Sequence, residues 1–340
     1  MEIAEVAAPA KLNLTLRVGP ASADGFHPLR TWMVTVGLRD RLLFSPAATD
    51  LSQADASEKV PGPRPAEVYQ AGDLRFRLTC NEPSLPLDET NLVVKAAKGF
   101  MEEARRSGMT PQQVDAAARG LEIALEKHIP AGGGLGGGSS DAAATLVGLS
   151  LQLGLVLPEA RKQRLAASLG SDVPFFWAHL RHHLSHTSDA RVRSAECTGR
   201  GEVVEPTAEP RPAAALLLLP ALACPTGQVY RHFDTLFPDG GDLTGPSPAD
   251  LADLHAEAML PHLVNHLQPA AFDLFPQLAR LADSARERLG RPVLLSGSGS
   301  TLFTLFDEMG EAESAGKLLG NHPAAKNVAP FRAVAVTLPD

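Results

Sequence analysis

Alternating apolar and polar side chains near the amino terminus predict the first β-strand, over residues 3–18. Every second residue from Leu12 to Leu16 is a leucine, so the leucines share one face of this strand. Lys11 and Asn13 fall on the opposite face. The pattern leaves two interpretations of this polar face open, because a lysine on a strand can be solvated or can face a cleft.

Apolar spacing along the rest of the chain predicts strands and helices that interleave. The expected strands cover residues 31–37, 40–44, 74–79, 121–125, 213–219, 293–295, 302–306 and 333–338. The expected helices cover residues 91–101, 140–151, 158–169, 278–289 and 311–319. Because helices are grouped between the strands, we predict an α+β fold.

Two stretches lack this periodicity. Residues 45–72 are rich in Ala, Ser, Pro, Asp and Glu, which predicts a long surface insertion. Residues 207–212 read T-A-E-P-R-P, which is typical of a linker. We therefore predict an N-terminal domain over residues 1–207 and a C-terminal domain over residues 208–340.

The segment 130–144 reads P-A-G-G-G-L-G-G-G-S-S-D-A-A-A and has six glycines in seven positions. Glycines allow backbone N–H groups to come close to an anion, and the Ser-Ser-Asp that follows is suited to capping a helix. A glycine loop that leads into a helix N-terminus predicts a phosphate site. A flexible linker is the alternative, although a single glycine block between a strand and a capped helix is unusual for one.

Two known nucleotide-binding sequence patterns partly resemble this loop. Walker A requires a lysine where Ser139 stands, which excludes a P-loop NTPase. Gly132, Gly134 and Gly137 fit G-x-G-x-x-G, a match that is nearly automatic in so glycine-rich a run. It leaves an NAD-dependent oxidoreductase as a remote alternative, because the acidic residue at the appropriate spacing, Glu159, opens a predicted helix instead of ending a strand.

The composition of the chain limits the kinds of binding partner and the cellular location that we expect for the protein. The 340 residues are 44% hydrophobic, enough for two cores, and the formal net charge of −8 argues against binding to nucleic acid or to a membrane surface. No apolar run approaches the length of a membrane span, and the first residues lack the positive region of a signal peptide. Cys80, Cys197 and Cys224 are too scattered for a disulfide framework or a zinc site. We expect a cytoplasmic protein, as a monomer or a weak homodimer.

Eight sequence blocks together resemble the GHMP-superfamily kinases, and more specifically the branch that phosphorylates diphosphocytidyl-methylerythritol. They are A-P-A-K-L-N-L (8–14), D-G-F-H-P-L (24–29), T-N-L-V-V-K-A-A (90–97), E-K-H-I-P-A-G-G-G-L-G-G-G-S-S-D-A-A-A (126–144), L-G-S-D-V-P-F-F (169–176), T-G-R-G-E (198–202), P-T-G-Q-V-Y (225–230) and S-G-S-G-S-T-L-F (296–303). The blocks occur in the family's order and span almost the whole chain.

This resemblance implies an N-terminal domain like domain 2 of ribosomal protein S5 and a ferredoxin-like C-terminal domain, with the active site between them. The implied reaction transfers the γ-phosphoryl group of ATP to a tertiary hydroxyl of a small substrate carrying cytidine diphosphate, in the non-mevalonate isoprenoid precursor pathway. Mg²⁺ is expected to bridge the phosphates, because the glycine loop contributes no charge of its own.

The resemblance also implies roles for individual residues. Asp172 is expected to be the catalytic base and Lys11 its partner: the carboxylate takes the proton of the hydroxyl, and the ammonium offsets charge on the phosphoryl oxygens. The implied ATP-binding residues are Asn91, Lys127, Pro130, Ala131, Gly132, Gly133, Gly134, Leu135, Gly136, Gly137, Gly138, Ser139 and Ser140. The implied substrate-binding residues are Asn13, Phe26, His27, Thr226 and Tyr230.

Among the substrate residues, Phe26 and Tyr230 align with an aromatic pair that sandwiches cytosine, and His27 aligns with the residue that reads the edge of the base. Phe26 stands where the family often carries tyrosine. A different small-alcohol kinase of the same superfamily is the main alternative, and it would have no use for this sandwich. A catalytically inactive binding protein is disfavoured because Lys11 and Asp172 are both present.

Residues 177–197 depart from the family pattern and contain four histidines. His179, His182, His183 and His186 are spaced to share one helical face, which could bind a metal. A polar surface insertion is favoured over a metal site, because only Asp189 is nearby as a further ligand. We assign no metal-ligating residue.

Overall fold

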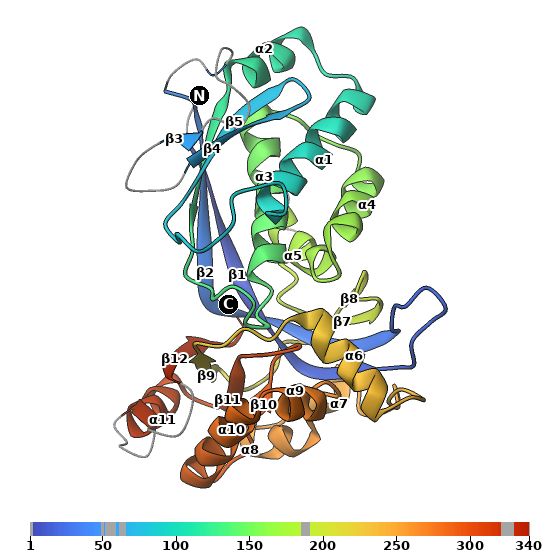
Figure 1. Cartoon of the computed structure of the whole chain (residues 1–340), viewed down its shortest axis with the longest axis vertical. Helices are drawn as coiled ribbons and strands as arrows, with labels where there is room; N and C mark the ends of the chain where they lie inside the picture. Colours follow the sequence, from blue (N-terminus) through green and yellow to red (C-terminus); the bar gives the residue numbers. More distant parts are fainter. Residues whose placement is uncertain are drawn as a thin grey trace. The chain divides into compact units, whose positions relative to one another are not determined.

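The structure is a computed structural model that describes residues 3–48, 51, 59–60, 66–184, 191–320 and 330–339. The chain forms two compact units that interleave in sequence (Figure 1). The first comprises Met1–Pro9, Arg39–Ile129 and Gly137–Arg191, and the second comprises Ala10–Leu38, Pro130–Gly136 and Val192–Asp340. The predicted α+β class is confirmed. The predicted domain division at residues 207 and 208 is contiguous, unlike these units, and stays a prediction.

Two long strands contribute to both units: β1 (Ala4–Val18) and β2 (Leu29–Pro46) pair with each other. The two predicted strands at 31–37 and 40–44 are parts of one strand, because β2 stays extended between the residues that pair with β7 and those that pair with β6. In the first unit, residues 41–46 of β2 pair with β6 (Leu121–Glu126). In the second unit, residues 29–34 of β2 pair with β7 (Ser194–Gly199), which pairs with β8 (Val203–Pro206).

The sheet of the first unit continues from β6 through β5 (Leu74–Cys80) and β4 (Ala66–Ala71) to β3 (Lys59–Val60). The β5–β6 pair is parallel, whereas the other pairs are antiparallel. The expectation that residues 45–72 form a surface insertion is wrong for β4, which pairs with β5 and buries Val68 and Tyr69. The composition of residues 45–72 did not predict this strand, which is stabilised by pairing with β5.

Five helices follow one another in the described part of the first unit. They are α1 (Leu92–Ser107), α2 (Pro111–Arg119), α3 (Gly137–Leu153), α4 (Glu159–Leu169) and α5 (Val173–Leu180). A 3₁₀ turn, Arg181–Leu184, follows α5. The helix α3 is buried on nearly all sides, because α1 and α5 pack against it. Helices α2 and α5 were not predicted, although a capping box at Thr110 and Gln113 marks the start of α2.

The second unit has a four-stranded antiparallel sheet in the order β10 (Leu294–Leu295), β11 (Leu302–Phe306), β9 (Ala214–Pro220) and β12 (Phe331–Thr337). Its helices are α6 (Thr226–Leu236), α7 (Pro248–Leu251), α8 (Ala256–Met259), α9 (Gln268–Leu274), α10 (Pro276–Leu289) and α11 (Met309–Gly320), with a 3₁₀ turn at Leu260–His262. Leucines of β9 and α10 and Phe233 of α6 build the core of this unit. The expected ferredoxin-like arrangement matches this antiparallel sheet with its helices.

Candidate active site

The glycine loop Pro130–Gly136 is an ordered part of the second unit. The backbone N–H of Lys11 donates to the carbonyl of Leu135 over 3.0 Å, and the N–H of Thr301 donates to the carbonyl of Gly133 over 3.0 Å. Gly132, Gly134 and Gly136 have φ near +70°, which other residues adopt only with strain. The loop is therefore not a flexible linker.

Gly134 permits a close approach between this loop and the S-G-S-G-S segment, residues 296–300. A Cβ atom at Gly134 would lie 2.2 Å from the carbonyl oxygen of Ser296 and 2.9 Å from that of Gly299. The hydroxyl of Ser296 also donates to the carbonyl of Gly134 over 3.0 Å. Asn265 also holds the start of this segment, because its Nδ2 donates to the carbonyls of Leu295 and Gly297 over 2.8 Å each.

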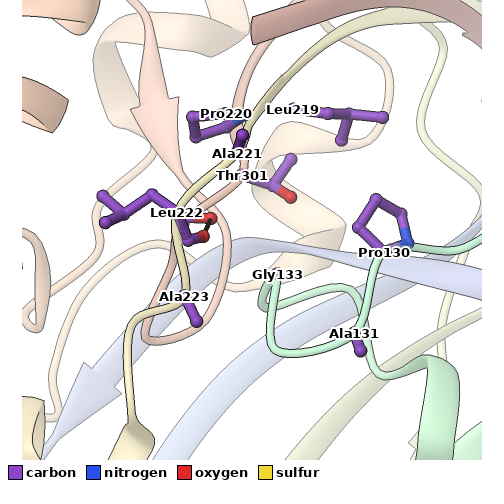
Figure 2. Close-up of a pocket in the computed structure, with 10 residues that line it drawn as sticks. Pro130, Ala131, Gly133, Leu219, Pro220, Ala221, Leu222, Ala223 and Thr301 are labelled. Carbon is purple, nitrogen blue, oxygen red and sulfur yellow. Dashed lines mark hydrogen bonds between the residues drawn. The ribbon is translucent and has the colours of Figure 1, made fainter. Parts of the chain in front are cut away.

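A cavity of about 270 Å³ opens beside the start of the glycine loop. Figure 2 shows Pro130, Ala131 and Gly133 on one side of it and residues 219–223 on another. The hydroxyl-bearing residues Ser300 and Thr301 complete the lining. Three of the predicted ATP-binding residues, Pro130, Ala131 and Gly133, thus line this cavity in the second unit.

In the first unit, α3 begins at Gly137, directly after the loop. The predicted phosphate-binding residues Gly137, Gly138, Ser139 and Ser140 form its first turn. Ser140 Oγ and Asp141 Oδ1 are buried, and neither has a hydrogen-bond partner among the described residues. Two buried oxygen atoms near the N-terminus of α3 are therefore available to a ligand. The backbone N–H groups of the same helix N-terminus favour anions.

Lys127 belongs to a buried ion cluster in the first unit. Its Nζ lies 2.8 Å from Asp141 Oδ2 and also bonds to Asp40 Oδ2. Asp40 Oδ1 in turn accepts the backbone N–H of Ile129 over 2.9 Å and that of His128. Asp40 thus ties β2 to the end of β6, at the point where the chain turns toward the glycine loop.

The same cluster shifts the pKa values of its members. Burial raises the pKa of Asp141 to about 7, and the nearby Lys127 only partly opposes it. Burial alone would lower the pKa of Lys127, but Asp141 and Asp40 outweigh it and leave that pKa raised. The Lys127 ammonium is committed to two carboxylates, so an adenosine contact through Nζ would have to compete with them.

Asn91 is the N-cap of α1. Its Oδ1 accepts the N–H of Val93 over 2.9 Å, and its Nδ2 donates to the carbonyl of Pro86 over 2.8 Å. These two bonds fix the orientation of the amide in the first unit. The predicted contact of Asn91 with adenosine stays a prediction.

Asp172 stands at the start of α5 in the first unit. The N–H of Val173 donates to the carbonyl of Gly170, which folds the residues around Asp172 into a turn. A Cβ atom at Gly170 would lie 3.8 Å from Ser139 Oγ, so this turn is beside the first turn of α3. Buried aromatic residues Phe175 and Phe176 anchor the helix behind it.

Lys11 and Asn13 are both buried, at 3% exposure, on the polar face of β1 in the second unit. The Nζ of Lys11 donates to Asn13 Oδ1, and Asn13 Nδ2 donates to Thr31 Oγ1 over 2.8 Å. A Cβ atom at Gly297 would lie 3.4 Å from Lys11 Nζ. Of the two interpretations of this face, the solvated one is wrong.

The predicted base-binding residues lie in the second unit. The rings of His27 and Tyr230 are 5.1 Å apart and tilted by 45°. Phe26 is half exposed, and the guanidinium of Arg200 lies over its ring at 4.0 Å. Thr226 shares a hydrogen bond of 3.0 Å with Ser298. His27 and Tyr230 are thus brought together, while one side of Phe26 is covered by Arg200.

The predicted residues divide between the two units. Lys11, Asn13, Phe26, His27, residues 130–136, Thr226 and Tyr230 belong to the second unit, whereas Asn91, Lys127, residues 137–140 and Asp172 belong to the first. The pairing of Lys11 with Asp172 joins residues of different units and stays a prediction.

Several residues that hold the site were missed from the sequence. Ser296 lies in the S-G-S-G-S segment, whose pattern indicates no role for it, whereas Asp40 is a charged residue in a predicted strand and could have been singled out. Thr31 and Asn265 carry no such signal, because their hydrogen bonds link segments far apart in sequence.

The histidine-rich stretch is partly regular structure. His179 lies on α5, and His182 and His183 lie on the 3₁₀ turn that follows, whereas His186 and Asp189 are outside the described residues. His182 Nδ1 bonds to the carbonyl of His179 over 2.7 Å, and its Nε2 accepts from Arg191 Nε over 2.9 Å. Within the described ranges, no group of three or more His, Cys, Asp or Glu side chains is placed to hold a metal ion.

None of the helices in the described part of the chain is both long enough and apolar enough to cross a membrane.

Comparison with known proteins gives consistent matches along the chain. Residues 91–179 match the GHMP kinases N terminal domain, and residues 248–321 match the GHMP kinases C terminal domain. The 4-diphosphocytidyl-2-C-methyl-D-erythritol kinase of Chlorobium phaeobacteroides is 31% identical over 97% of this chain and 99% of its own length. The enzyme of that name from Nocardioides sp. is 36% identical over 90% of each chain.

Solved structures agree with these relatives. A crystal structure of 4-(cytidine 5'-diphospho)-2C-methyl-D-erythritol kinase has 33% identity and a TM-score of 0.69, covering 99% of this chain and all of that one. The Methanococcus jannaschii mevalonate kinase, at 14% identity and a TM-score of 0.58 over 100% of this chain and 99% of its own, shares the fold.

Proposed function

The chain belongs to the family of 4-diphosphocytidyl-2-C-methyl-D-erythritol kinases within the GHMP kinases, and we propose that it phosphorylates the tertiary 2-hydroxyl of that substrate with ATP, a step of the non-mevalonate isoprenoid precursor pathway. The observation that carries the proposal is the joining of Lys11 to the glycine loop. The backbone of Lys11 bonds to Leu135, and its ammonium bonds to Asn13 beside Gly297.

The chemistry assigns Asp172 as the general base. Its carboxylate takes the proton of the substrate hydroxyl as the new oxygen–phosphorus bond forms, and the bond between the γ-phosphorus and the bridging oxygen of ATP breaks to release ADP. Lys11 offsets negative charge on the transferred group. The buried Asn13 fixes the direction of the Lys11 ammonium, which is the preorganisation that this stabilisation needs.

We assign the phosphates of ATP to the glycine loop and the first turn of α3. The positive φ angles of Gly132, Gly134 and Gly136 support a loop whose backbone can lie close to an anion. Asn91 and Lys127 are the proposed adenosine contacts, of which Lys127 must act while paired with Asp40 and Asp141.

Mg²⁺ is the expected counterion of the phosphates, and the residues at the start of α3 fit it. Hard cations prefer oxygen ligands, and the buried Ser140 Oγ and Asp141 Oδ1 make no hydrogen bond to the described residues. These two atoms, with Ser139, would hold the ion. It would supply positive charge to the phosphate oxygens.

The cytidine diphosphate end of the substrate is assigned to the second unit. His27 and Tyr230 already pack together, and Phe26 offers an exposed ring. Stacking on aromatic faces gives affinity for any base, so His27 is the group proposed to discriminate cytosine. Asn13 and Thr226 are proposed to contact the rest of the substrate. A cytoplasmic location and a monomer or weak homodimer remain predictions, and size-exclusion chromatography tests the latter.

The test is ATP turnover with four acceptors: the cytidine substrate, mevalonate, homoserine and galactose. We expect turnover with the cytidine substrate alone. Asp172→Asn is expected to lower kcat by about 10²–10⁴-fold. The matched control Asp283→Asn, on the exposed side of α10, should retain full activity. Turnover of another alcohol in preference would place the protein elsewhere among the GHMP kinases, and full activity of Asp172→Asn would exclude Asp172 as the base.

A further inference from the structure

Asp234, on α6, contacts the histidine that faces the proposed base site. Its Oδ1 lies 2.6 Å from His27 Nε2. The two side chains differ in exposure, at 6% for His27 and 42% for Asp234. The ring of Phe233 meets His27 edge-on at 6.1 Å, and the ring of Tyr230 lies 5.1 Å from it, tilted by 45°. The His27 ring is therefore held in one orientation by two aromatic residues and one carboxylate.

The contact with Asp234 determines where His27 carries its proton. A carboxylate can only accept, so the Nε2 of His27 must be the protonated nitrogen. In neutral His27 the other ring nitrogen, Nδ1, is then an acceptor. Nδ1 makes no hydrogen bond to any described residue, and it is not sealed from solvent. An acceptor of fixed direction is thus left open to a ligand.

We propose that Asp234 is a positioning residue that fixes the Nε2-protonated form of His27, so that Nδ1 accepts a hydrogen bond from the exocyclic amino group of cytosine. This inference rests on the proposed function, because it assumes that His27 faces the base. Uracil carries a carbonyl oxygen where cytosine carries that amino group. Two acceptors would then face each other, which leaves both without a partner and disfavours uridine-linked substrates.

The first experiment compares kcat/KM for the cytidine-linked substrate and its uridine-linked counterpart. We expect Asp234→Ala to lower the cytidine-to-uridine ratio by about tenfold or more, mainly through KM, because buried polar mismatches carry large discrimination. Asp234→Glu, which restores an acceptor, should recover part of the ratio. The control Asp273→Ala breaks the His232–Asp273 pair between α6 and α9, a pair of the same kind, and should leave the ratio unchanged.

The second experiment reads the protonation of His27 directly, by ¹⁵N NMR of the imidazole in the free protein. We expect Nε2 to be protonated in the wild type and the two neutral forms to mix in Asp234→Ala. Two results would overturn this inference and leave the proposed function intact. One is a wild-type His27 protonated on Nδ1, and the other is an unchanged cytidine-to-uridine ratio in Asp234→Ala. A wild type that turns over another alcohol and not the cytidine substrate would overturn the proposed function and this inference with it.

Discussion

Thr31 determines which way the side-chain amide of Asn13 points. The Thr31 hydroxyl donates to the carbonyl of Thr15 over 2.6 Å, so toward Asn13 it can only accept. Asn13 therefore turns its Nδ2 to Thr31, at 2.8 Å, and its Oδ1 to the ammonium of Lys11. A threonine from β2 thus orients the lysine assigned to the phosphoryl group.

Thr31→Val is expected to lower kcat while the fold persists. The substitution removes the acceptor and leaves the buried Asn13 amide unsatisfied, at a cost of about 1–3 kcal/mol in the free energy of unfolding. The Asn13 amide can then rotate away from Lys11. Turnover and urea unfolding of the same samples measure both effects. Thr31→Ser keeps the hydroxyl and serves as the control. Equal kcat for Thr31→Val and wild type would show that Thr31 does not orient Lys11 through Asn13.

Lys127→Met is expected to destabilise the first unit strongly. It leaves Asp40 and Asp141 buried without their cation, and breaking a buried pair in this way costs about 3–5 kcal/mol. Urea unfolding gives the free-energy difference. Lys98→Met removes a lysine from the exposed Lys98–Glu89 pair and should change stability little. Similar losses for the two variants would show that the cluster adds nothing beyond a surface pair.

Stability should fall between about pH 4 and pH 7 because of Asp141. Burial raises the pKa of this carboxyl from 3.8 to about 7, so the folded state holds its proton more tightly than the unfolded state does. The contribution is therefore fully present below pH 3.8 and is lost as the pH rises through 7. Urea unfolding should show that the free energy of unfolding decreases less from pH 5 to pH 8 for Asp141→Asn than for wild type. Parallel pH profiles would assign the dependence to other groups.

Gly134→Ala is expected to reduce ATP turnover on the order of 10²-fold, because the loop must shift away from residues 296–300. Gly132→Ala provides the comparison. Both glycines have positive φ, at +76° and +69°, so both substitutions strain the backbone. The nearest atom to a Cβ at Gly132 is 3.7 Å away, however, so only Gly134→Ala also displaces a neighbour. Equal losses would show that strain alone matters.

The sequence alone predicted the features that depend on local pattern. The period-two alternation around Lys11 placed Lys11 and Asn13 on one face of β1, and the glycine block before an apolar segment located the loop and α3. The predicted cap at residues 139–141 is wrong, because α3 already begins at Gly137 and these residues lie inside the helix. Asn91, directly before the apolar helical spacing, fell at the N-terminus of α1. These inferences succeed because backbone conformation and the face of a side chain are set by neighbours within a few residues.

Only the tertiary structure decided which side chains meet. Lys127 pairs with Asp40 across 87 positions, and His27 meets Asp234 across 207. β4 became a strand because β5 pairs with it, against its composition. Periodicity carries no information about such partners, because it records which face of an element is buried and not what lies opposite. The hydrogen bonds of Thr31, Asp40 and Asp234 exist only once distant segments have packed. For that reason the sequence could locate the candidate site residues but not the residues that orient them.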